Sequence, residues 1–119
     1  DPRTSGPTDY DLHMVPASEV LSLHSLVTPT PDGIASRILA KTPGGSVTLF
    51  AFAEGQGLTE HTSPFDALVM VLEGALILTI GGVAMRTEPG TLVRMPADIP
   101  HAVDAPEAAR MLLTMLKAS

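Results

Sequence analysis

The sequence has no cysteine, no tryptophan and few charged residues. Because cysteine is absent, disulfides, zinc–thiolate sites and a cysteine nucleophile are all excluded. The absence also fits a reducing cytoplasm, where we expect the protein to be located. Aromatic residues make up only 3% of the chain. This disfavours a carbohydrate site, because sugars usually stack on the face of an aromatic ring.

Positive charge is scarce as well. The chain has 7 Lys and Arg against 13 Asp and Glu, so its net charge is −6 and its pI is near 4.9. Nucleic-acid binding needs a basic surface that neutralises phosphates, so we expect no nucleic-acid partner. No apolar run reaches the roughly 20 residues that a membrane-spanning helix needs, so we expect no membrane partner either.

Apolar residues, by contrast, are plentiful enough for one compact domain. They make up 45% of the 119 residues, and this length suits one domain rather than two. Charged residues make up 17%, against about a quarter in an average domain. A small domain with so little charge is expected to cover part of its surface with a second copy, so we predict a homodimer.

The opening of the chain differs in composition from the rest. Residues 1–15 are mostly polar and are interpreted as a leader or an arm, which leaves residues 16–119 for a single barrel domain. Met14 is one candidate for the native start. The alternative is a native arm that docks on a partner subunit. Residues 16–26 mix serine with valine and leucine, which is compatible with a short helical turn or an edge strand.

Short runs typical of β-strands follow one another from residue 34 onward. Glycine and proline separate them, and the pair Gly81-Gly82 between two apolar runs indicates a hairpin. Many short strands divided by such turns predict an all-β fold. Two of the runs are apolar on both faces, so one face must meet a second sheet or a second subunit. The predicted strands are 34–41, 46–53, 58–63, 67–72, 75–80, 83–87, 91–95, 101–104 and 110–116.

Two blocks within this region resemble the paired motifs of the cupin superfamily. The first motif is Gly-x5-His-x-His-x3–4-Glu-x6-Gly; Gly55, His61 and Gly74 match it, whereas Ser63 and Ala67 replace the second histidine and the glutamate. The second motif is Gly-x5-Pro-x-Gly-x2-His. It is matched by Gly90, Pro96 and His101, and Asp98 takes the place of the second glycine.

The resemblance implies a cupin-type jelly-roll β-barrel of short antiparallel strands. Cupins are often dimers, and they include metal-dependent dioxygenases and isomerases, metal-free epimerases and ligand-binding domains. The resemblance therefore implies a fold rather than one activity. Carried over position by position, it assigns His61 and His101 to metal-ligand positions. Ser63 and Ala67 stand at the other two ligand positions but do not match the usual ligands.

Strand geometry supports a site at the two histidines. His61 and Ser63 are two residues apart, so their side chains lie on the same side of a strand. We expect both to face the barrel interior, with His101 opposite and with Phe50 or Phe52 lining the cavity. Two imidazoles can hold a divalent metal such as Zn, Fe, Ni or Cu weakly, with water completing the coordination. The alternative is a metal-free cavity with two hydrogen-bonding histidines.

Other candidate side chains are assigned structural roles. Glu60 and Asp66 have the opposite strand parity to the ligand positions, so they should point away from the cavity unless a bulge rotates one inward. Asp98 should adopt the left-handed turn conformation that glycine usually takes. Thioether with imidazole suits Cu(I), but methionine in a core with few aromatic residues is usually filler. The methionines in strand-like runs are Met70, Met95, Met111 and Met115.

Two classes of function follow from these observations. The first is a small-molecule-binding domain with a two-histidine site inside the barrel. The second is an enzyme that uses His61 and His101, as a metal-dependent oxygenase or isomerase or as a metal-free acid–base isomerase. The sequence does not identify the ligand or substrate.

Overall fold

The computed structural model describes residues 14–118. Residues 1–13 of the predicted leader or arm (residues 1–15) lie outside the described residues. Within the described part, no helix is both long and apolar enough to cross a membrane. The elements, in chain order, are η1 (Leu23–Ser25), β1 (Ile34–Thr42), β2 (Gly45–Phe52), β3 (Gly57–His61), β4 (Phe65–Glu73), β5 (Ile77–Ile80), β6 (Val83–Arg86), β7 (Leu92–Met95), β8 (His101–Asp104) and β9 (Ala109–Lys117).

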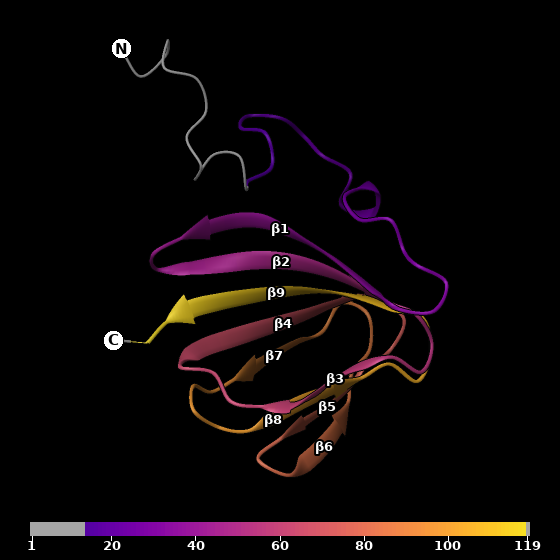
Figure 1. The fold of residues 1–119 in the computed structure, drawn as a ribbon, viewed down its shortest axis with the longest axis vertical. Coiled ribbons are helices and arrows are strands. Elements are labelled where there is room, and N and C mark those ends of the chain that lie inside the picture. Colours follow the sequence, from indigo (N-terminus) through magenta and orange to yellow (C-terminus); the bar gives the residue numbers. More distant parts are fainter. Residues whose placement is uncertain (1–13, 119) are drawn as a thin grey trace.

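The strands form two antiparallel sheets that face each other (Figure 1). The larger sheet has the order β1-β2-β9-β4-β7, and the smaller has the order β3-β8-β5-β6. Strands distant in the sequence, such as β2 and β9, are neighbours, which is the connectivity of a jelly roll. The predicted all-β fold is confirmed, and every predicted strand has a counterpart within two residues at each end.

The main core lies between the two sheets. Alternate residues of β4 and β9 point inward from the larger sheet and meet inward residues of β5 and β8. Burial of each large aliphatic side chain contributes about 1.5–3 kcal/mol relative to its exposed state. Among residues 14–118, the largest fully buried side chains are Leu49, Leu76, Leu78, Met111, Val69, Val71 and Val103.

The glycines shared with the two motifs stabilise turns. Gly55, Gly74 and Gly90 all have positive φ, between 68° and 85°, a conformation that costs other residues free energy. Gly74 is further constrained, because a Cβ atom there would lie 2.2 Å from the carbonyl oxygen of Ala108. Asp98 has φ of 65°, so the prediction that it takes the left-handed position of the usual glycine is confirmed.

The outer face of the larger sheet is partly covered by the segment before β1. Val27, from this segment, packs with Leu49 and Ala51 of β2 in a second buried cluster. The backbone N–H of Val15 donates to the carbonyl of Leu39 in β1, at 2.9 Å. Residues of the same chain therefore cover the outer face of β1 and β2. They leave Met70, on the outer face of the predicted strand 67–72, exposed.

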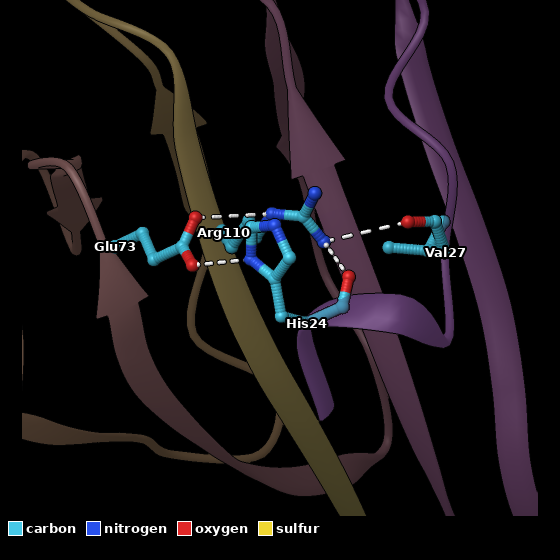
Figure 2. Close-up of polar contacts among 4 residues, drawn as sticks. All are labelled: His24, Val27, Glu73 and Arg110. Carbon is cyan, nitrogen blue, oxygen red and sulfur yellow. Dashed lines mark hydrogen bonds and ion pairs between the residues drawn. The ribbon is translucent and has the colours of Figure 1, made fainter. Parts of the chain in front are cut away.

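Arg110 anchors this segment to the sheet (Figure 2). Its side chain is only 8% exposed, and its Nε donates to Oε2 of Glu73 at 3.1 Å. Its Nη1 donates to the carbonyls of His24 at 3.0 Å and Val27 at 3.4 Å. His24 Nδ1 donates to the other oxygen of Glu73 at 2.7 Å. One buried guanidinium thus joins η1, the following loop and the end of β4.

Replacement of Arg110 by alanine is expected to lower the free energy of unfolding by about 2–3 kcal/mol. The change leaves two backbone carbonyls and a half-exposed carboxylate without their donor. Arg86 is the matched control, because it is also an arginine in ion pairs, with Glu88 and Glu107, but its side chain is 57% exposed. Arg86→Ala should cost less than about 0.5 kcal/mol. Urea unfolding followed by far-UV circular dichroism measures both, and equal losses would show that Arg110 is no anchor.

Candidate functional site

His61 and His101 are direct cross-strand partners in the pairing of β3 with β8. The register shifts by one residue between Leu58 and His61, because Leu58 pairs with Val103 and His61 with His101. This β-bulge changes the strand parity, so Leu58 and His61 both line the same cavity although they are three residues apart. The bulge therefore turns His61 toward the barrel interior.

Each imidazole is held by a backbone carbonyl two residues before it. His61 Nδ1 lies 2.7 Å from the carbonyl oxygen of Thr59, and His101 Nδ1 lies 3.1 Å from that of Ile99. A carbonyl oxygen can only accept, so Nδ1 must carry the proton in both rings. In the neutral form, Nε2 of each ring is then an acceptor with a free lone pair. This is the tautomer in which histidine binds a metal ion or a hydrogen-bond donor.

The two rings lie side by side, with different access to solvent. Their centroids are 4.4 Å apart, and the ring planes make an angle of 67°, an edge-to-face arrangement. His101 is buried at 6% exposure, whereas His61 is exposed. The pair therefore joins the interior of the barrel to its surface, which places the site at a mouth.

The turn before His101 is bound to the first motif. The N–H of Asp98 donates to the carbonyl of Ser63 at 2.8 Å, and the N–H of Ala97 donates to Oδ1 of Asp66 at 3.0 Å. Asp66 also pairs with Arg94 at 3.3 Å. Asp66 thus points away from the cavity, as strand parity predicted, and it positions the turn that carries His101.

A small cavity of about 40 Å³ lies beneath the two rings. A volume of this size holds one water molecule or one ion, whereas sites for organic ligands usually measure about 300–1,000 Å³. Apart from the two histidines and Ser63, its walls are apolar. The lining residues are Leu58, His61, Ser63, Ala67, Met95, His101, Val103, Met111, Leu113 and Met115.

The structure brings three of the five predicted site residues together. His61, Ser63 and His101 all line the cavity, and Ser63 Oγ accepts from the N–H of Phe65 at 3.2 Å. Phe50 and Phe52 stack on each other in β2, with ring centroids 5.9 Å apart. They belong to the adjoining core and are not among the residues that line this cavity.

Several contributions to the site were not found from the sequence. The carbonyls of Thr59 and Ile99 orient the rings, and Asp66 holds the turn. Backbone acceptors have no signature in residue type, so no sequence pattern could have shown them. The methionines of the cavity were visible only as members of strand-like runs, because their convergence depends on the register between strands.

The donor set does not fit the complete divalent centre that the motifs imply. Across residues 14–118, no group of three or more histidine, aspartate or glutamate side chains converges to hold a metal ion. A serine hydroxyl is a poor ligand unless it is deprotonated, and Ala67 offers none. A divalent ion bound only by His61 and His101 would keep several water ligands. Weak binding of this kind remains a prediction.

Two larger hollows lie elsewhere on the molecule. One, of about 360 Å³, lies beside the β1–β2 turn and Thr114–Leu116 of β9; the other, of about 180 Å³, lies between Pro29 and Arg110. The first is lined by a single titratable side chain, that of Lys41. The second is lined by Glu73 and Arg110, which already pair with each other. The histidine cavity is therefore the better candidate.

The comparisons with known proteins agree with the fold and with the motif positions. The family model for the cupin domain matches residues 48–116, a segment that contains both motifs and both histidines. Because this match spans more than half of the chain, the protein belongs to the cupin family. No curated protein matches the chain.

Solved structures with the same fold include three from bacteria. A conserved protein of unknown function from Streptococcus pyogenes is 36% identical, with a TM-score of 0.83 over 88% of this chain and 92% of that one. A cupin superfamily protein from Desulfitobacterium hafniense is 25% identical, with a TM-score of 0.81 over 89% and 96%. A cupin 2 conserved barrel domain protein from Leptotrichia buccalis is 34% identical, with a TM-score of 0.78 over 82% of this chain and 47% of that one. These likenesses identify the family and name no activity.

Proposed function

We infer that this protein is a ligand-binding cupin domain whose site is the histidine pair at the mouth of the barrel. The observation that carries this inference is the anchoring of both Nδ1 atoms by backbone carbonyls at 2.7 Å and 3.1 Å. The two Nε2 acceptors belong to rings whose centroids lie 4.4 Å apart. Such a pair suits a group that donates to both or a cation that accepts both lone pairs.

The size of the cavity limits which part of a ligand can enter. At about 40 Å³, it admits one atom or one small polar group, so the body of an organic ligand would lie outside, against the exposed ring of His61. An amine head can donate to both neutral acceptors, whereas a hydroxyl head, with its single proton, can donate to one of them. Binding is favoured over metal-dependent oxygenation, since non-haem iron oxygenases use two histidines and a carboxylate.

A screen of small amines and alcohols by nuclear magnetic resonance tests this function. Binders should shift the backbone amide signals of β3 and β8, where the two histidines pair. The double variant His61→Ala/His101→Ala should weaken these binders about tenfold or more, because two hydrogen bonds to the head group are lost.

His24→Ala is the matched control, because His24 is an exposed histidine bonded to Glu73, remote in sequence from both motifs. It should leave binding unchanged. Binders that act at the β1–β2 turn, or that bind the double histidine variant as tightly as the parent protein, would contradict the proposed site.

The sequence also predicted an enzyme as the alternative. Two imidazoles in contact, one exposed and one buried, are an arrangement that can pass a proton between solvent and a bound molecule. This favours the metal-free acid–base isomerase among the enzymatic alternatives. Such an enzyme would have to bind its substrate at the same pair, so the binding screen is also the first test of this alternative.

A homodimer and a cytoplasmic location remain predictions. Support for a dimer comes from Met70 and Leu92, which are cross-strand partners on the outer face of the larger sheet. They are 41% and 58% exposed, and exposed apolar pairs favour burial against a second subunit.

Light scattering at micromolar concentration should therefore show twice the mass of one 12.4 kDa chain. The variant Met70→Lys/Leu92→Lys should show the mass of a single chain, because burial of two ammonium groups opposes association. A monomeric parent protein would contradict the predicted dimer, and a dimeric variant would place the interface elsewhere.

A further inference from the structure

The cavity beneath the histidines is walled by methionine side chains. Met95 of β7, together with Met111 and Met115 of β9, lines the same volume of about 40 Å³ as His61 and His101. Three thioethers and two imidazoles are therefore among the side chains that line one small cavity.

Cross-strand register explains why sulfur surrounds this position. Ala67, at the place of the usual glutamate, pairs with Met95 on one side and with Met115 on the other. Directly paired residues point to the same face of a sheet. The small alanine therefore lies between two long thioether side chains, both directed into the barrel. Met111 of β9 pairs with Val71 of β4, so it lies four residues farther along the sheet than the pair of Ala67 with Met115.

The chemistry of these donors selects one class of ion. Thioether and imidazole are soft to intermediate ligands that suit Cu(I), whereas manganese and magnesium require carboxylate or water oxygen. All the donors here are neutral. A buried ion is therefore left with its full charge, and the solvation penalty grows with the square of that charge. The desolvation penalty of a monovalent ion is consequently about a quarter of that of a divalent ion in the same cavity.

We propose that the cavity binds a single Cu(I) ion through His61, His101 and the thioethers of Met95 and Met115. This proposal rests on the proposed function in one respect, since it uses the same pair of free Nε2 atoms. It differs in assigning a soft monovalent ion to the interior of the site, with sulfur ligands in place of the carboxylate and second histidine of the motif.

The test is an anaerobic competition for Cu(I) between the protein and the chromophoric chelator bicinchoninate, with ascorbate as reductant. The parent protein should withdraw one equivalent of Cu(I) from the chelator. Met95→Leu/Met115→Leu should lower the affinity about tenfold or more, because the sulfur donors are lost. Leucine has nearly the volume of methionine, so the core should remain packed. X-ray absorption of the loaded protein should show copper–sulfur scattering.

Met70→Leu is the matched control, since Met70 lies on β4 but is exposed on the outer face. It should bind Cu(I) as the parent protein does. Failure of the parent protein to compete, or full affinity in the double methionine variant, would overturn the proposal and leave the histidine site standing. Copper binding that also survives in His61→Ala/His101→Ala would overturn the proposal and argue against the histidine site itself.

Discussion

The pairing of His61 with His101 across β3 and β8 is the contact on which the site depends. Two features place the rings there. A bulge in β3 turns His61 inward, and the turn before β8, bound to Ser63 and Asp66, sets where His101 begins its strand. The backbone carbonyls of Thr59 and Ile99 then fix the tautomer of each ring. The residues of this chain that match the motifs therefore fix the placement of the two imidazole rings, whatever ligand they bind.

Ser63 and Ala67, at two positions where the cupin motif has metal ligands, change the electrostatics of this site. A cupin centre with a glutamate ligand carries negative charge that offsets a divalent ion, whereas no carboxylate lines the cavity here. Neutral donors penalise a dication more than a monovalent ion or a hydrogen-bond donor. Loss of the carboxylate thus changes the kind of ligand that fits, while the nitrogen acceptors stay in place.

Most of the fold could be predicted from the sequence because its determinants are local. Strand runs, glycine turns and the left-handed Asp98 follow from alternation and backbone conformation. The family likewise follows from the spacing of Gly55, His61 and Gly74.

The rest depends on contacts between residues that are distant in the sequence. Covering of the outer face by the segment before β1 relies on Arg110, which lies 86 residues from His24. The methionine walls arise from the register of β4 with β7 and β9. The narrowness of the cavity is a property of packing, and packing cannot be read from a pattern of residue types. For these reasons the histidine pair was predictable from the sequence, whereas the methionine lining and the small volume of the cavity were not.

The tautomeric state of the two histidines is the most direct test of the proposed site. Long-range ¹H–¹⁵N correlation spectra at alkaline pH, where imidazoles are neutral, distinguish a protonated ring nitrogen from one with a free lone pair. Both His61 and His101 should have a protonated Nδ1 and an unprotonated Nε2. A proton on Nε2 of either ring would contradict the proposed site, because Nδ1 could then not donate to its backbone carbonyl and the pair of free acceptors would not exist.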